Sequence, residues 1–338
     1  MALNYSPVTY TGKLVEPILE QIFFANKTIS DNYVTFNDNI KAGAIFTEAG
    51  VSVTAQLYTG QALSATGSLN ITDRTITPIK LEYKQTFLQE ALRTSRFNLS
   101  MKAGAWNIES DEFASKVLAM VGPAVSQDAE TQFWSGITST TKSAVAALTA
   151  GATQGFISSS AQTAVAAMTA GNVDGVISKV LYDLSAVGQY IKVAGTTVTS
   201  SNIATEFSKI YAKIPAENLA NATSDVVIYA PRGWKQLMRI ANNSVGAAQQ
   251  INFLFDNATN DSKCYYNGVE VLFVPITMGD FAYAQMRDAV SWNTDLTDDV
   301  NKFEVGKLVN DGDVQYVRSI YAMAANVGRA NKGVLYGG

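Results

Sequence analysis

The amino-acid sequence predicts a mixed α+β protein, on three observations. Residues 44 to 88 alternate apolar and polar side chains, which is typical of strands with one packed face. Residues 110 to 136 repeat apolar positions at helical spacing. Strand-like runs begin at residue 226 and recur toward the end of the chain. We therefore expect an α+β fold that is rich in strands at its end.

Composition limits the chemistry that the chain can perform. Its 338 residues include no His and one Cys, and only 16% are charged. His is the commonest general acid or base at neutral pH and the commonest metal ligand, so its absence disfavours serine and zinc hydrolases. The single Cys264 excludes an internal disulfide and any multi-thiolate metal site. Low charge is typical of surfaces that pack against other protein.

The charge balance also bears on partners. A net charge of −4, without a dense Lys and Arg run, argues against a dedicated nucleic-acid reader. No stretch approaches 18 consecutive apolar residues, and the start lacks a basic segment followed by an apolar core. We expect no membrane span and a product that stays inside the cell.

The first quarter of the chain predicts an arm and a long hairpin. Residues 14 to 24 carry an apolar stripe, which predicts a docked terminal helix or an extended arm on a neighbouring subunit. Two alternating runs, 51 to 58 and 69 to 83, flank a turn-rich tip at 59 to 68. We expect a β-hairpin over residues 44 to 88, with arms of about 15 residues that reach on the order of 50 Å. A hairpin this long cannot bury both faces in its own domain, so we expect it to lie on another molecule.

A long helix is expected next. Ser110 is a candidate cap, and Asp111 and Glu112 suit the positive end of the helix dipole. Helical spacing continues to a stop at Gly136, and Pro123 is expected to bend or split the helix. The positions expected to face a core or an intersubunit seam are Phe113, Val117, Met120 and Val121.

Residues 143 to 178 contain an internal repeat with a period of 20 residues, and its Ala, Ser, Thr and Gly composition predicts two short helices. Further helical stripes cover 177 to 191 and 203 to 214, the second behind a candidate cap at Asn202. The elements expected after them are a buried strand at 226 to 230, a helix that starts at Pro231, a turn at Asn267 and Gly268, and strands at 269 to 274, 281 to 292 and 314 to 325.

No motif predicts catalysis, a cofactor or a metal. The aspartates at 295, 298 and 299, and those at 311 and 313, lack the glycine and terminal glutamate of an EF-hand, so we interpret them as solvated turns. No glycine-rich phosphate loop occurs. The residues expected to make intersubunit contacts belong to the hairpin and the long helix: Thr59, Gly60, Gln61, Gly67, Arg93, Arg96, Asp111, Glu112 and Phe113.

The order of these elements resembles the major capsid protein of tailed double-stranded DNA bacteriophages, which has the Hong Kong 97-like fold. The resemblance rests on residues 110 to 136 as the spine helix, 226 to 237 as a strand and helix of the axial domain, and 266 to 280, which contains Asn-Gly, Pro and Gly-Asp in that order. Glu270 departs from the pattern, because many members have a proline before the valine. The repeat at 143 to 178 is a second departure.

The resemblance implies five regions. They are an N-terminal arm at 1–40, an extended hairpin loop at 41–96, the spine helix and peripheral domain with the insertion at 97–175, an axial domain at 176–280, and return strands of the peripheral domain at 281–338. It also implies a structural protein, not an enzyme, that assembles with itself.

By the same resemblance, hexamers and pentamers would form an icosahedral shell around double-stranded DNA, without sequence recognition and with separate scaffold, portal and decoration proteins. The shell would be assembled in the host cytoplasm and become the virion capsid. Two alternatives stay open. An encapsulin-like cellular shell would hold a cargo enzyme, and a β-rich adhesin or fibre subunit is disfavoured by the mixed α/β stretch from 176 to 275.

Overall fold

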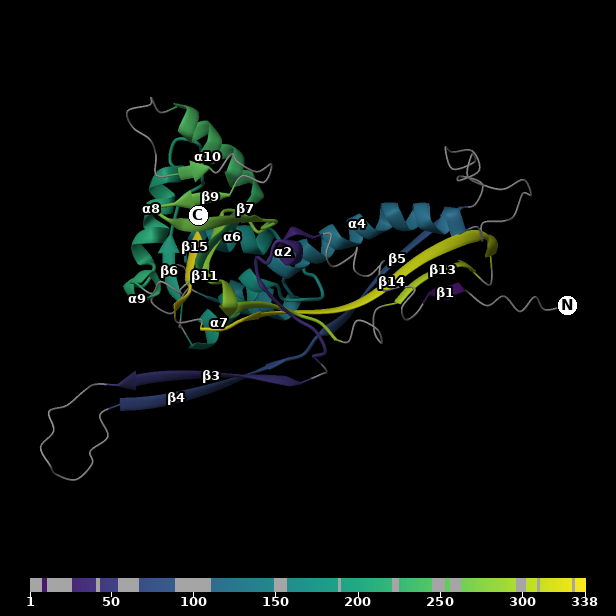
Figure 1. Ribbon diagram of the computed structural model, residues 1–338, viewed down its shortest axis with the longest axis horizontal. Helices are drawn as coiled ribbons and strands as arrows, with labels where there is room; N and C mark the ends of the chain where they lie inside the picture. Colours follow the sequence, from purple (N-terminus) through teal and green to yellow (C-terminus); the bar gives the residue numbers. More distant parts are fainter. Residues whose placement is uncertain are drawn as a thin grey trace, which may run out of the picture.

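The computed structural model describes residues 8–10, 26–40, 43–53, 67–88, 111–148, 157–187, 190–220, 225–244, 253–255, 263–295, 302–308, 311–329 and 332–338. Figure 1 shows three parts: helices gathered around a sheet at one end, a limb in which one helix runs along long strands, and a two-stranded ribbon that projects from the limb. Helices and strands are combined as the α+β prediction requires.

A six-stranded sheet forms the limb. Its strands are β1 (Val8–Tyr10), β13 (Lys302–Leu308), β14 (Asp311–Val327), β12 (Val290–Asn293) and β2 (Thr35–Asn37), in this spatial order, with β5 (Ile79–Leu88) also on β14. All pairs are antiparallel except β12 with β2. β14, with 17 residues, is the central strand of the limb, because it pairs with three other strands.

A seven-stranded mixed sheet forms the other end of the molecule. In spatial order its strands are β6 (Ile191–Ala194), β15 (Val334–Gly337), β11 (Phe281–Met286), β7 (Val226–Pro231), β10 (Val269–Val274), β9 (Cys264–Tyr266) and β8 (Phe253–Phe255). The predicted strand at 226 to 230 is confirmed as the central β7, which is buried at every position. The predicted turn is confirmed too, since Asn267 and Gly268 both have positive φ between β9 and β10.

Two hydrophobic clusters lie on opposite faces of this sheet. Val227 and Tyr229 of β7 belong to one cluster, while Ile228 and Ala230 belong to the other. Neighbouring residues of a strand point to opposite faces, so this alternation means that both faces are covered. The helices that contribute to the clusters are α4 (Asp111–Ser135), α5 (Ser139–Ala146), α6 (Ser159–Ala167) and α7 (Val176–Val187) on one side, and α8 (Ile203–Lys213) and α10 (Arg232–Ser244) on the other.

The long helix is confirmed as α4, which ends at Ser135, directly before the predicted stop at Gly136. The helix is continuous through Pro123, so of the two expected effects of this proline the split is excluded, while the bend stays a prediction. Gly122 removes one of the steric conflicts of a proline within a helix: the proline ring clashes with the Cβ of the preceding residue, and Gly122 has no Cβ. Val121 packs against the core as predicted, whereas the side chains of Phe113, Val117 and Met120 lie outside the described residues.

The internal repeat forms two short helices, as predicted. The N-caps of α5 and α6 are Thr138 and Ser158, which are 20 residues apart, and each side chain accepts a hydrogen bond from the backbone three residues later. Val145 and Val165 occupy equivalent buried positions in the two helices. The duplication in sequence is therefore also a duplication of local structure.

Two predictions in the next segment need correction. The helical stripe from 177 to 191 is too long, because α7 ends at Val187 and Ile191 begins β6. Asn202 precedes α8 but does not cap it, since its Oδ1 accepts hydrogen bonds from the backbone and hydroxyl of Thr199. Strands predicted at 281 to 292 and 314 to 325 are confirmed as β11, β12 and β14.

The return arm of the hairpin ends earlier than predicted, at Ile76. β3 (Ala44–Val53) pairs with β4 (Gly67–Ile76), so each arm has 10 paired residues within the described part of the chain. After Thr77 and Pro78 the chain enters β5, which pairs with β14 and not with β3. Proline has no backbone N–H to donate, which suits a position where one ladder ends and another begins. The apolar stripe predicted at 14 to 24 lies outside the described residues.

Candidate assembly surfaces

The most exposed apolar surface of the described chain is the β3–β4 ribbon. Its pairing runs from Ala44 opposite Ile76 to Val53 opposite Gly67, and it projects from the limb (Figure 1). Neither edge pairs with another strand in the part of the chain that the structure describes. Isolated two-stranded ribbons are marginal in water, and unpaired edges invite pairing or contact with another chain. The ribbon therefore has the properties of a contact element.

The register of β3 and β4 determines which side chains share a face of the ribbon. Odd-numbered positions of both strands share one face, because Ile45 lies opposite Thr75 and Ala49 opposite Ile71. On that face Ile45 is 65% exposed and Ile71 is 61% exposed. The sequence also has apolar residues at positions 51, 53 and 69. Exposed apolar side chains on one face of a ribbon are a feature of surfaces that contact other protein.

The root of the ribbon is fixed to the limb. Ile76 is buried at the end of β4, and Arg74 Nη1 donates a hydrogen bond of 3.1 Å to the carbonyl oxygen of Val327, the last residue of β14. The ribbon is thus anchored at one end, while Ile45 and Ile71 remain uncovered.

Most of the contact residues predicted from the sequence lie outside the described residues. Gly67 is placed as the first residue of β4, opposite Val53. The helix α4 does begin at Asp111, although the side chains at its start are not described. The predicted contact residues whose own contacts therefore stay predictions are Thr59, Gly60, Gln61, Arg93, Arg96, Asp111, Glu112 and Phe113.

A buried polar junction fixes α4 to two other segments. Glu130, 3% exposed, accepts hydrogen bonds through Oε1 from the backbone N–H and hydroxyl of Thr28, at 3.2 and 2.7 Å. Its Oε2 lies 2.5 Å from Nη2 of Arg232. Trp134 Nε1 donates to the Thr28 hydroxyl at 2.9 Å. The junction joins α4 to α10 and to the short helix α2 (Lys27–Ser30), and sequence patterns did not predict it.

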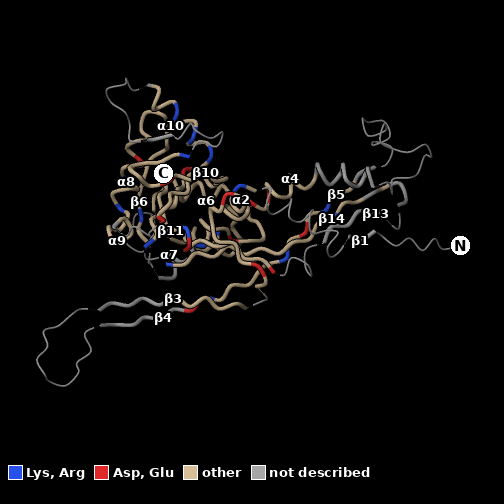
Figure 2. Tube along the Cα trace, in the orientation of Figure 1, with Lys and Arg blue, Asp and Glu red and all other residues tan. Residues whose placement is uncertain are grey.

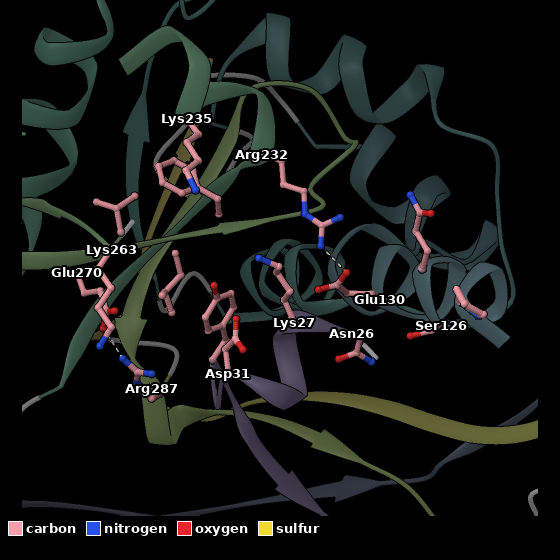
Figure 3. A pocket seen from close by; sticks show the side chains of 16 residues that line it. Asn26, Lys27, Asp31, Ser126, Glu130, Arg232, Lys235, Lys263, Glu270 and Arg287 are labelled. Atoms are coloured by element: carbon pink, nitrogen blue, oxygen red, sulfur yellow. Dashed lines mark hydrogen bonds and ion pairs between the residues drawn. The ribbon is translucent and has the colours of Figure 1, made fainter. Parts of the chain in front are cut away.

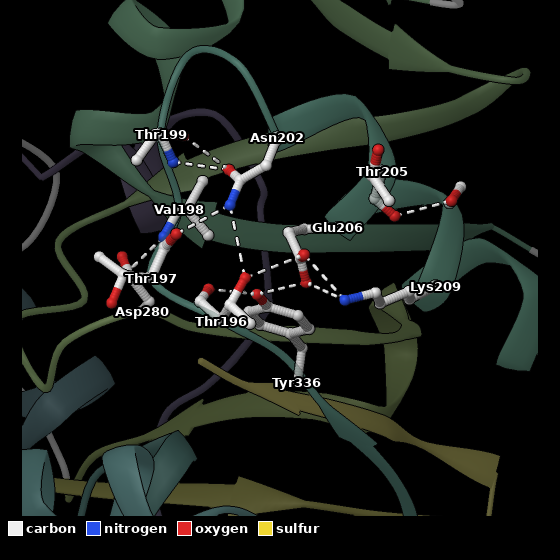
Figure 4. A network of polar contacts seen from close by, with 11 residues as sticks. Thr196, Thr197, Val198, Thr199, Asn202, Thr205, Glu206, Lys209, Asp280 and Tyr336 are labelled. Carbon is white, nitrogen blue, oxygen red and sulfur yellow. Dashed lines mark hydrogen bonds and ion pairs between the residues drawn. The ribbon is translucent and has the colours of Figure 1, made fainter.

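A second polar network holds the last strand in place (Figure 4). The hydroxyl of Tyr336 on β15 lies 2.9 Å from Glu206 Oε2, and Lys209 Nζ lies 2.8 Å from Glu206 Oε1. Burial opposes ionisation of Glu206, but hydrogen bonds from Lys209, Tyr336 and Thr196 and the charge of Lys209 outweigh it and lower its pKa. Burial and the hydrogen bond with Glu206 raise the pKa of Tyr336. The network therefore holds an ionised carboxylate beside a neutral phenol.

Acidic and basic residues are interspersed over the described chain in Figure 2. Within the described ranges, no three His, Cys, Asp or Glu residues are grouped as a metal site requires. None of the described helices is long and apolar enough to cross a membrane. Cys264 is a free thiol, as a single cysteine requires, and the structure buries it. Burial raises its pKa to about 12, so it is protonated at neutral pH.

Comparison with solved structures shows which known proteins share this fold. No family model matches the sequence, and no curated protein matches it. Solved structures do match over nearly the whole length. A chain of the satellite phage P4 procapsid, a structure that includes the size determination (Sid) protein, has a TM-score of 0.52 and 10% identity, over 96% of this chain and 98% of that one.

Two further structures agree. The capsid of the native GTA particle has a TM-score of 0.54 and 9% identity, over 92% of this chain and 90% of that one. A structure of Mycobacterium phage Ogopogo has a TM-score of 0.52 and 9% identity, over 98% of this chain and 94% of that one. The chain therefore has the α+β fold of phage capsid proteins, and the fold expected from the sequence is confirmed.

Proposed function

We propose that this chain is a structural major capsid protein, which assembles with copies of itself into the hexamers and pentamers of an icosahedral shell around double-stranded DNA. The observation that carries the proposal is the anchored β3–β4 ribbon, whose exposed Ile45 and Ile71 have no cover within the described chain. The fold shared with capsid structures supports it. A ribbon of this kind gains order and buried area only when another subunit covers it.

The proposed partner of the ribbon is the spine helix of an adjacent subunit. The hairpin tip, with Thr59, Gly60, Gln61 and Gly67, would lie over the first turns of that helix, which carry Asp111, Glu112 and Phe113. Arg93 and Arg96 would form ion pairs with the carboxylates across the interface. The projection of the ribbon away from its own limb supports a contact with another copy (Figure 1).

The remaining assignments follow from the same proposal. The regions are the arm at 1–40, the extended loop at 41–96, the spine helix and peripheral domain at 97–175, the axial domain at 176–280 and the return strands at 281–338. The chain performs no catalysis and works with separate scaffold, portal and decoration proteins. It assembles in the host cytoplasm and ends in the virion capsid, where it encloses DNA without reading its sequence.

The test replaces the eight residues 60 to 67 with a short turn. We expect an unchanged melting temperature of the unassembled subunit and a loss of shells in negative-stain microscopy, because only the intersubunit contact is removed. A control shortens the eight residues 149 to 156 in the repeat and should still assemble. Normal shells from the tip variant would contradict the proposal. Nuclease-protected DNA inside wild-type particles separates this function from an encapsulin, which would hold a cargo enzyme.

A further inference from the structure

A cleft of about 860 Å³ lies where α2, α4, α10 and β10 meet (Figure 3). This volume is within the range of small-molecule sites, roughly 300 to 1,000 Å³. Five cationic side chains and three carboxylates line it, although the whole chain carries a net negative charge. The charged lining residues are Lys27, Arg232, Lys235, Lys263 and Arg287, and Asp31, Glu130 and Glu270.

Two of the three carboxylates are already neutralised within the wall. Glu130 is paired with Arg232 at 2.5 Å, and Glu270 is paired with Arg287 at 2.6 Å. Arg287 also pairs with Asp225 at 2.7 Å, outside the lining. With Asp225 included, five cationic and four anionic side chains belong to the cleft and its ion pairs. The cleft therefore keeps a surplus of positive charge after its internal ion pairs are counted.

Two of the lysines that line the cleft, Lys235 and Lys263, form no ion pair with any residue that the structure describes. The Lys235 ammonium lies 5.6 Å from the centre of the Phe273 ring, which also lines the cleft. Arg232 and Lys235 are three residues apart on α10, so they lie on the same side of that helix and both reach the cleft.

We propose that this cleft binds phosphate groups, those of a free polyphosphate or nucleotide or those of a DNA backbone. A terminal phosphate carries nearly two negative charges, and a DNA backbone carries one on each successive phosphate, so either engages several lysines better than a single carboxylate does. Arg232 retains further guanidinium N–H donors, whose fork geometry suits phosphate oxygens, and the lysines act as point charges. All residues that line the cleft belong to one chain, so the unassembled subunit carries the whole site.

Calorimetric titration of the purified full-length chain with inorganic pyrophosphate, and separately with a duplex DNA of about 20 base pairs, tests the proposal. The variant combines Lys235→Gln and Lys263→Gln, which strands no carboxylate of the described chain. The matched control combines Lys80→Gln and Lys213→Gln, two exposed lysines that do not line the cleft. Equal melting temperatures of the three proteins show that the fold is intact.

We expect pyrophosphate to bind the wild type and the control equally, and the cleft variant at least tenfold more weakly. Duplex DNA that binds with the same dependence on Lys235 and Lys263, while pyrophosphate does not bind, identifies the DNA backbone as the source of the phosphate. The proposal is overturned if neither probe binds, if the control loses as much affinity as the cleft variant, or if a hexaglutamate peptide binds as tightly as the phosphate probes.

Discussion

The Glu130 carboxylate and the Arg232 guanidinium lie 2.5 Å apart and link the long helix α4 to α10 of the sheet-rich end. Glu130 is almost fully buried, whereas the Arg232 side chain is 41% exposed at the cleft. Glu130 lies 102 residues after Thr28 in the sequence, and Arg232 lies 102 residues after Glu130. The carboxylate of Glu130 therefore links three segments that are distant in the sequence: α2, α4 and α10.

Glu130→Ala should lower the free energy of unfolding by about 3 kcal/mol. The substitution leaves the buried N–H and hydroxyl of Thr28 without their acceptor, and each unsatisfied buried group costs roughly 1 to 3 kcal/mol. Urea denaturation of the unassembled subunit measures the change. The control is Glu82→Ala, whose pair with Arg318 is exposed and should be worth less than about 1 kcal/mol. Equal effects of the two substitutions would contradict the role of Glu130.

Gly136 permits a close backbone approach after α4. A Cβ at this position would lie 2.5 Å from the carbonyl oxygens of Gln132 and Val173. Gly136→Ala should therefore destabilise the subunit by about 2 kcal/mol or more, because backbone atoms would have to shift. Gly233→Ala is the control, since its Cβ would meet nothing within 4 Å and α10 should gain roughly 0.5 to 1 kcal/mol. Melting temperatures of both variants test this expectation. An unchanged melting temperature of Gly136→Ala would show that the backbone contacts around Gly136 are not tight.

The Glu206 network predicts a defined pH dependence. The pKa of Glu206 is lowered from its ordinary value of 4.5, so the ionised form stabilises the fold above that value and the stabilisation is lost as pH falls through the lowered pKa. Glu206→Gln should be less stable than the wild type near neutral pH, and this difference should shrink below about pH 4.

Melting temperatures of the two proteins, measured from about pH 7 to pH 3, test this expectation. Glu217→Gln is the control, because Glu217 is exposed and its pair with Lys332 is 3.5 Å long. A stability difference for Glu206→Gln that stays constant over the whole pH range would show that its ionisation is not linked to folding.

Local patterns predicted the elements whose partners are nearby in the sequence. Helical spacing located the end of α4, and the apolar run at 226 to 230 located β7, because burial on both faces leaves a continuous apolar stretch. The composition of the 20-residue repeat predicted two short helices, and in the structure each helix has its own capping side chain. These features depend on the residues within each element.

Features that depend on distant partners could not be predicted in the same way. β4 and β5 show the same alternation of apolar and polar residues. This pattern does not indicate that β4 pairs with β3 and β5 with β14. Pro78 was the one sequence feature that indicated where the chain changes its partner strand. Glu130 stands among buried positions of α4, which marks it as a paired carboxylate, but Thr28 and Arg232 become its partners only through the fold.

The last prediction concerns the two faces of the ribbon. Ile45→Ser combined with Ile71→Ser should change the free energy of unfolding of the unassembled subunit by less than about 1 kcal/mol, because both side chains are exposed there. Shell assembly should be strongly weakened, since the partner subunit would no longer bury the apolar face. Phe46→Ser is the control, because position 46 lies on the opposite face of the ribbon and is exposed as well. Light scattering during assembly compares the three proteins at equal concentration. If the double variant assembles as the wild type does, or if Phe46→Ser blocks assembly and the double variant does not, the odd-numbered face is not the contact surface.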